Sequence, residues 1–186
     1  MTNTDILDLI KSDKWMMQVL EVARSLNLPD WMIGAGFIRG KVWDHLHGYT
    51  TPTPLSDIDF IYFDREGLKP STKENELIED QYQNRLKSLL NLNWSVTNQA
   101  RMHLENHDKE YNSSEDAMSY WPETATAVAV RLLDDGSLTL FAPYSINDLV
   151  NLKVRISPNF TRPKSLFEER VSKKQWLKKW PLIEVI

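Results

Sequence analysis

The chain contains no cysteine, and this absence alone excludes disulfides, thiolate zinc sites and cysteine nucleophiles. Long apolar runs are also missing, since no stretch approaches the roughly 18 residues that a membrane helix needs. The first residues, MTNTDILDLIKSDKW, carry acids where a secretory signal has a basic segment and an apolar core. We therefore expect a cytoplasmic protein with no membrane partner.

The 186 residues and an ordinary share of apolar side chains favour a single domain over residues 1–186. Within it, 1–28 is expected to be an N-terminal helical segment and 151–186 a basic helical C-terminal segment. Residues 1–150 carry 23 acidic and 13 basic side chains, whereas residues 151–186 carry 3 and 9. The basic segment could contact phosphates or pair with the acidic body, and charge alone does not decide between these roles.

Hydrophobic spacing predicts a mixture of helices and strands. Apolar residues at helical intervals behind Thr4 predict a helix that Pro29 ends, and Asp135-Gly136 between two β-rich runs predicts a hairpin. Ser145 is expected to cap the helix that follows. The other predicted elements are a strand within 30–36, a helix over 37–48, a strand over 57–63, a helix over 77–90, a strand over 94–98 and a basic helix over 165–180. This mixture predicts an α/β or α+β fold with a small mixed β-sheet flanked by helices.

Asp57 and Asp59 begin an otherwise apolar strand and point to the same side of it, because side chains alternate along a strand. They are roughly 7 Å apart at two residues of rise. Two unpaired carboxylates there would repel each other and resist loss of water. A divalent cation removes both problems, and Mg²⁺ prefers carboxylate oxygens while keeping waters that phosphates can replace. Capping, exposure or salt bridges would be the simpler explanation of the pair in isolation.

Gly34 and Gly36 lie between the first short strand and a helix. Glycine lets backbone N–H groups approach a phosphate closely, and a helix start attracts an anion. A tight strand–helix turn is the simpler explanation of a lone G-x-G. The pattern is not a dinucleotide fingerprint, because Arg39 occupies the third glycine position, and not a Walker loop, because Val42 stands where Ser or Thr is needed.

The order strand, Gly-x-Gly, helix, loop, and strand with Asp-x-Asp resembles the nucleotidyltransferase superfamily of polymerase-β type. Four stretches are together similar to a small bacterial family of uncharacterised activity within it, covering most of the chain from about residue 30. They are GAGFIRGKVWDHLHG, PLSDIDFIYFD, NQARMH and FEERVSKKQWLKKWP.

This resemblance implies the nucleotidyltransferase-type fold and a set of roles. Gly34 and Gly36 would face the phosphates of an NTP, with Ser56 supporting the loop. Asp57 and Asp59 would be the catalytic pair and would bind Mg²⁺, or Mn²⁺ in its place. Arg39 and Lys41, on the first turns of the helix, could bind phosphate or pair with acidic groups.

A third carboxylate usually accompanies the pair in active members of the superfamily, on a neighbouring strand. The matching strand here offers Asn98, which brings no charge and is a poor base. Glu105, Asp134 or Asp135 could substitute, although Asp135 is typical of a turn residue beside glycine.

Gln99 and Arg101 would line the active site together with Asn98 if the strand continued past residue 98. The competing interpretation is an internal ion pair between Arg101 and Asp57 or Asp59. Both interpretations stay open at the level of sequence.

The function expected from the resemblance is Mg²⁺-dependent transfer of a nucleoside monophosphate from an NTP to an unidentified acceptor hydroxyl. The alternative is a catalytically inactive nucleotide-binding or scaffolding domain that retains the fold. Trp176 and Trp180 among four lysines resemble a surface for single-stranded nucleic acid. Their spacing fits a buried helical stripe better, so a nucleic-acid partner is not favoured.

Overall fold

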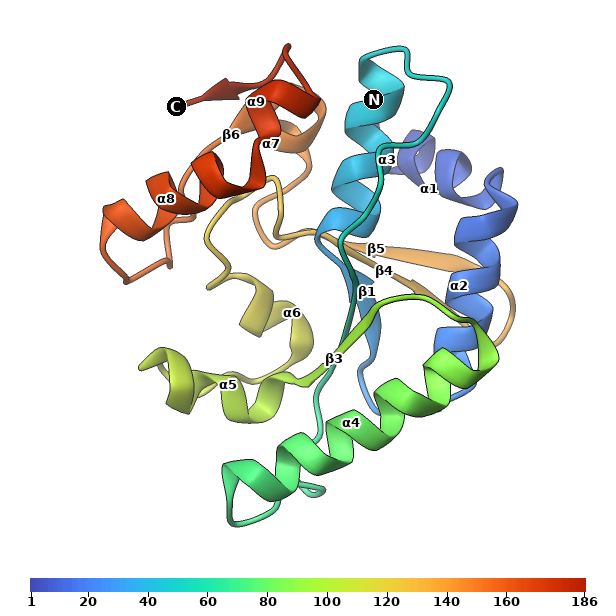
Figure 1. Cartoon of the computed structure of the whole chain (residues 1–186), viewed down its shortest axis with the longest axis vertical. Coiled ribbons are helices and arrows are strands. Elements are labelled where there is room, and N and C mark those ends of the chain that lie inside the picture. The colour runs from blue at the N-terminus through green and yellow to red at the C-terminus, as the bar shows by residue number, and fades with distance from the viewer.

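The computed structural model describes all 186 residues and is organised around a five-stranded sheet in the order β3-β2-β1-β4-β5 (Figure 1). The pair β2–β3 is parallel and the other neighbours are antiparallel. The strands are β1 (Met32–Gly34), β2 (Ile58–Tyr62), β3 (Trp94–Asn98), β4 (Ala129–Leu132) and β5 (Leu138–Phe141). This mixed sheet with flanking helices confirms the expected α/β class.

At one end of the central strands, segments that are distant in sequence come together. Because β1 and β2 are antiparallel, with Ile33 opposite Phe60, the end of β1 lies beside the start of β2. Gly34 is also opposite Ala129, so β4 begins at this same end of the strands. The chain enters α3 (Gly36–Leu46) directly from β1, and this places a helix N-terminus next to the first residues of β2.

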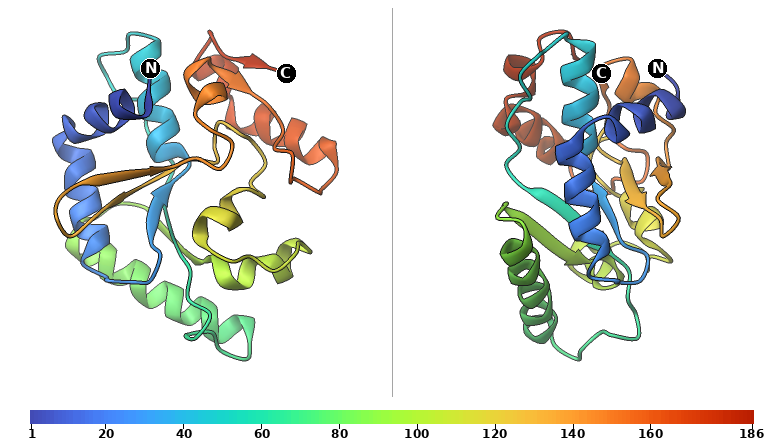
Figure 2. Two further views of the ribbon diagram at one scale, coloured as in Figure 1. Left: turned by 180° about the vertical axis from the view of Figure 1, so that it is seen from behind. Right: turned by 90° about the vertical axis from the view of Figure 1, so that its right-hand side faces the viewer.

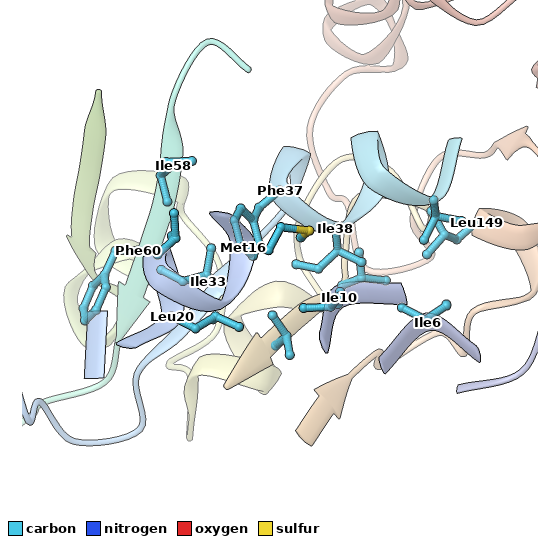
Figure 3. Packing of buried hydrophobic residues seen from close by; sticks show 14 of the residues in the cluster. Ile6, Ile10, Met16, Leu20, Ile33, Phe37, Ile38, Ile58, Phe60 and Leu149 are labelled. Carbon is cyan, nitrogen blue, oxygen red and sulfur yellow. The ribbon is translucent and has the colours of Figure 1, made fainter. Parts of the chain in front are cut away.

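The main core lies between one face of the sheet and the helices α1 (Asn3–Lys11), α2 (Lys14–Arg24), α3 and α4 (Thr72–Leu89). Figure 3 shows Ile33 and Phe60 of the sheet facing Leu20 of α2, and Ile10 of α1 beside Ile38 of α3. These side chains are fully buried. Burying side chains of this size contributes about 1.5–3 kcal/mol each, which fixes the helices against the sheet.

The opposite face of the sheet carries a smaller cluster of Met32, Ile61, Met118 and Ala129. It is covered by α6 (Ser114–Met118) and adjoined by α5 (Gln99–Asn106), which follows β3 without a loop. Asp59 alternates with Ile58 and Phe60 of the main core and therefore belongs to this second face.

The C-terminal segment packs at the end of the molecule away from α4, as both views in Figure 2 show. It contains α7 (Asn147–Val150), β6 (Lys153–Val154), α8 (Lys164–Lys174), α9 (Trp176–Lys179) and β7 (Glu184–Val185). Trp176 and Trp180 are buried against Trp43 of α3, with ring centroids 5.8 and 5.1 Å from it. These contacts join the basic segment to the helix that begins beside the aspartates.

Several predicted boundaries are wrong for local reasons. The first helix is interrupted, because Asp13 caps α2 through the N–H groups of Trp15 and Met16. Ser145 has φ +62° and is not the N-cap of α7, a position that Ile146 takes.

Two further elements near the predicted site also differ. The basic C-terminal helix breaks at Gln175, whose φ is +52°. Residues 99–106 form a helix and do not extend β3, because Asn98 caps it through the N–H of Ala100. The hairpin around Asp135-Gly136 is confirmed as β4–β5. None of the helices combines the length and apolar character that crossing a membrane would need.

Candidate active site

A cleft of about 50 Å³ lies where β1, β2 and α3 meet. Asp57 and Asp59 line it from the start of β2, and Gly36 and Arg39 line it from α3. The C-terminal segment supplies the opposite wall. Its cleft-lining residues are Arg170, Lys174, Trp176, Lys179 and Trp180.

Asp57 and Asp59 have no cationic side chain within salt-bridge distance. The Ser56 hydroxyl donates to Asp57 Oδ1 at 2.6 Å. Burial, reinforced by the charge of Asp57, raises the pKa of Asp59 to about 6, although Arg39, Lys174 and Arg170 act in the opposite direction. The cleft therefore contains a carboxylate whose charge the folded protein does not neutralise.

The turn before α3 has a strained backbone and free donors. Ala35 has φ +53° and ψ −120°, a conformation that non-glycine residues rarely adopt. No side chain caps α3, and Arg39 N, which donates to Ala35 O at 3.0 Å, makes the first bond of the helix ladder. The N–H groups of Gly36, Phe37 and Ile38 therefore lack a helical partner, and the helix dipole favours an anion beside them.

The two glycines of the turn have different surroundings. A Cβ on Gly36 would meet only Leu55 and Arg39, at 3.7 and 3.8 Å, and Gly36 lines the cleft. A Cβ on Gly34 would lie 2.8 Å from the ring of Trp121, closer than real contacts allow. Gly34 does not line the cleft, so packing explains this glycine, and the expectation that it faces phosphates is not supported.

Arg39 is buried at the base of the cleft with 6% of its surface exposed. Its guanidinium lies over the Trp176 ring at 4.4 Å and the Trp43 ring at 5.3 Å, and it donates to Thr126 Oγ1 at 2.7 Å. Burial lowers the pKa of Arg39 to about 10, against the raising influence of Glu123 and the two aspartates. Arg39 remains charged at neutral pH, and its Nε atom has no partner.

Glu123 is a buried carboxylate that our sequence reasoning missed. It has no exposed surface, accepts from Arg170 Nε at 2.7 Å through Oε1, and leaves Oε2 without a partner. It lies in a loop with no recognisable motif, so no local signal identified it. The excess positive charge of residues 151–186 was the available signal for Arg170 and Lys174 in the cleft.

Lys41 lies outside the cleft. Its Nζ donates to Asp13 Oδ2 at 2.6 Å, on the side of α3 that faces α2. Lys41 therefore pairs with an acidic group, which was one of its two expected roles. Arg39, two residues earlier, lies on the cleft side of the helix. The helical period explains this separation, since two residues turn the side chain by about 200°.

Asn98 does not lie near the aspartates. The parallel register places Asp59 opposite Ser95 and Asn98 opposite Tyr62, so Asn98 is three residues, or about 10 Å, further along the sheet. Its side chain bonds both the N–H and the carbonyl of Asp64, at 3.0 and 2.8 Å. Asn98 closes a loop and caps α5, and the prediction that it lines the active site is wrong.

Gln99 and Arg101 are also displaced from the cleft, because they belong to α5 and not to a continued strand. Gln99 is buried. Arg101 donates twice to Glu79, at 3.0 and 2.7 Å, and also to Glu105. Both earlier interpretations of Arg101 are therefore wrong, since its partners are glutamates of α4 and α5.

The cleft is lined by two carboxylates and no third. No group of three or more His, Asp or Glu side chains in the chain could hold a metal ion. Glu105 pairs with Arg101, and Asp135 accepts from Ser137 in the hairpin turn. Two neighbouring carboxylates with uncompensated charge fit Mg²⁺, which is commonly bound through one or two carboxylates with the rest of its shell left to water and phosphate. Asp57 and Asp59 would hold it.

The mixed sheet with flanking helices, the uncapped helix after β1 and the two aspartates at the start of β2 fit a nucleotidyltransferase-type fold. The family model described as "Nucleotidyltransferase" matches residues 21–185. The chain belongs to this nucleotidyltransferase family.

Solved structures agree with this assignment. One, described as revealing a CCA-adding enzyme head domain, is 33% identical with a TM-score of 0.83, covering 100% of this chain and 96% of the other. A tRNA-processing enzyme in an apo form is 15% identical with a TM-score of 0.50, and the match covers 91% of this chain but 42% of that enzyme. This second likeness concerns the fold alone. No curated protein matches the chain.

Proposed function

We propose that the protein transfers a nucleoside monophosphate from an NTP to an acceptor hydroxyl in a Mg²⁺-dependent reaction. The observation that carries this proposal is the position of Asp57 and Asp59 in one cleft with the free N–H groups of α3 and several cations. The aspartates lack an internal partner, and the N–H groups lack an acceptor. A metal-bound triphosphate supplies what both are missing.

Different residues of the cleft would bind the phosphate oxygens and the metal ion of the triphosphate. The first turn of α3 donates to phosphate oxygens, and Arg39 and Lys174 place positive charge beside them. Asp57 and Asp59 would hold Mg²⁺, which would supply neutralisation of phosphate charge and Lewis acidity when bound. The small volume of the cleft suits phosphate groups, so the nucleoside would lie outside it.

The transfer is a displacement at the α-phosphorus. The acceptor oxygen forms a new P–O bond, and the bond from the α-phosphorus to the oxygen that bridges to the β-phosphorus breaks. Pyrophosphate leaves with that electron pair, and the hydroxyl proton passes to solvent. Arg39, Arg170 and Lys174 stabilise the charge that develops on the leaving group. Arg39 and Arg170 are held in place beforehand by Thr126 and Glu123.

A second candidate function is nucleotide binding without transfer. The absence of a third acidic side chain beside Asp57 and Asp59 favours this alternative, because no carboxylate remains to take the hydroxyl proton. Glu123 is buried and paired with Arg170, so it does not fill that role.

Calorimetry with Mg²⁺ and each NTP tests binding on the wild-type chain and on Asp57→Asn. We expect binding by the wild type and at least a tenfold loss in the variant. Asp135→Asn is the matched control, since Asp135 is an exposed turn residue. Absence of binding by the wild type with all four NTPs contradicts the proposal.

Transfer is tested separately with NTP labelled at the α-phosphate. Because the 33% identical relative is described as a CCA-adding enzyme head domain, RNA with a free 3′ hydroxyl is one acceptor to include with small molecules and cell extract. Incorporated label supports transfer. Tight binding without incorporation into any acceptor supports the non-catalytic alternative.

A further inference from the structure

A larger cavity, of about 370 Å³, lies beside the cleft and has no part in binding the triphosphate. It is enclosed by the start of α2, by the side of α3 that faces α2, by residues 52–58 and by residues 92–93. Nothing in the reaction described so far requires such a space. Its volume is more than seven times that of the cleft at the aspartates.

The cavity and the cleft share one wall. Pro54, Leu55, Ser56 and Asp57 line both spaces, so this short segment separates them. Asp57 faces the cleft together with Asp59, yet it also borders the cavity. A molecule in the cavity would therefore lie beside Asp57, one of the two aspartates of the proposed metal site.

The cavity walls are largely apolar and carry an aromatic surface. Trp15 is 40% exposed although it is a large aromatic side chain, and its ring centroid is 5.8 Å from that of Phe37. Figure 3 shows Met16 and Phe37 next to each other, with Ile58 of β2 on the other side of Phe37. Leu55 and Leu92 complete the apolar lining. Such walls favour a flat apolar body.

Four charged residues line the cavity, and two of them, Lys41 and Asp13, form an ion pair. Its side chains keep 25% and 19% of their surface exposed, so both remain accessible. Asp13 is already used as the cap of α2, which fixes its position. The Lys41 ammonium has further N–H donors for a ligand, and the pair presents both signs of charge to a polar end group.

We propose that this cavity binds the acceptor, and that the acceptor is a small molecule with a hydroxyl group on an apolar ring. The inference rests on the proposed function and names the substrate class that the reaction would use. The ring lies against Trp15 and Phe37, a polar end group contacts Lys41 or Asp13, and the hydroxyl reaches past Asp57 toward the α-phosphorus. The bond changes are those given above, with the ring hydroxyl as the attacking group.

The size of the cavity supports a small acceptor over a polymer. Pockets of roughly 300–1,000 Å³ enclose small molecules and bury most of their surface. Three aspartates, Asp13, Asp44 and Asp57, line the cavity against a single lysine, Lys41, and this negative balance disfavours a polyanionic backbone. RNA would have to bind elsewhere.

The first experiment measures binding in the absence of NTP. Tyramine, 4-hydroxyphenylacetate and L-tyrosine serve as probes, because they share a hydroxylated ring and differ in the charge of the end group. With methyl-labelled methionine, we expect a saturable shift of the Met16 signal and none of Met32, which is buried on the opposite face of the sheet. If no probe moves the Met16 signal, the proposal is refuted while NTP binding is unaffected.

The second experiment asks which substrate the cavity serves. Trp15→Ala should weaken probe affinity roughly threefold to tenfold through the lost aromatic contact and leave the affinity for Mg²⁺ and NTP unchanged. Lys14→Met, an exposed neighbour on the same helix, is the matched control. If NTP alone shifts the Met16 signal and competes with the probes, the cavity holds the nucleobase and the acceptor assignment is wrong.

A final measurement separates failure of this inference from failure of the proposed function. Wild-type protein with labelled NTP and the tightest probe should yield the nucleotidylated probe. Trp15→Ala should raise the KM for the probe and leave the KM for NTP unchanged. Probe binding without NTP binding refutes the proposed function and, with it, the acceptor role. NTP binding and transfer to another acceptor, with the probes still excluded from the cavity, refutes only the inference.

Discussion

Replacement of Asp59 by asparagine should stabilise the protein while it removes metal binding. Asp59 is held in a poorly solvated position beside Asp57, and its pKa is raised from 3.8 to about 6. Each pKa unit corresponds to about 1.4 kcal/mol, so the ionised carboxylate costs the folded state about 3 kcal/mol at most. Since the side chain keeps some contact with water, we expect Asp59→Asn to raise the free energy of unfolding by about 1–3 kcal/mol.

The pH dependence of this gain follows from the direction of the shift. Below about pH 4, which is near the usual pKa of Asp, the carboxyl is protonated in both folded and unfolded chains and the variant has no advantage. As pH rises through 6, the wild type loses stability because the folded state must ionise a group that resists it. The gain of Asp59→Asn should therefore grow between pH 4 and 7 and stay constant above.

Urea denaturation at pH 4, 6 and 8, with and without Mg²⁺, measures these effects. Mg²⁺ should stabilise the wild type and leave Asp59→Asn unchanged, because the proposed site needs both carboxylates and exists only in the folded chain. Asp135→Asn should show no gain at any pH, since hydrogen bonds from Ser137 lower the pKa of Asp135. A variant less stable than the wild type at pH 8 would refute the reasoning about uncompensated charge.

Three further substitutions test other parts of the structure. Gly34→Ala should cost about 1–3 kcal/mol in urea denaturation because its methyl group meets an aromatic ring, whereas Gly36→Ala should fold normally, and equal stability of the two variants would contradict the packing argument. Asn98→Asp should lower the free energy of unfolding by about 1–3 kcal/mol, because it places a carboxylate against the carbonyl to which the amide donates. It should not increase the transfer rate, and faster transfer would support a third acid at this position. Lys174→Met should weaken NTP affinity severalfold in calorimetry. Lys173→Met should not, because Lys173 pairs with a glutamate outside the cleft. Equal losses would argue against a specific phosphate contact.

Features that depend on short-range patterns were predictable from residue order. The strand at 94–98 and the hairpin at Asp135-Gly136 follow from alternation and turn chemistry, and both are present as expected. The break between α1 and α2 was also encoded locally, by Asp13 in a capping position, but the continuous apolar spacing concealed it.

Residues whose neighbours come from distant segments were predicted poorly. A continued strand would make Arg101 either an active-site residue or a partner of Asp57 or Asp59. The cap at Asn98 starts a helix there instead and directs Arg101 toward Glu79. Glu123 carried no motif at all, and only its ion pair with Arg170, 47 positions later, gives it a place beside the cleft.

The residue pattern alone was enough to establish the α/β class, the shared side of Asp57 and Asp59 and the strand–turn–helix that precedes them, because period and turn chemistry act over a few neighbouring residues. Folding decided which groups surround that pair. The antiparallel pairing of β1 with β2 brings Gly36 and Arg39 beside the aspartates. Two tryptophans that pack on α3 bring the basic C-terminal segment to the same place. The register of β3 places Asn98 away from it. Register and packing depend on contacts between distant segments, which no local pattern contains.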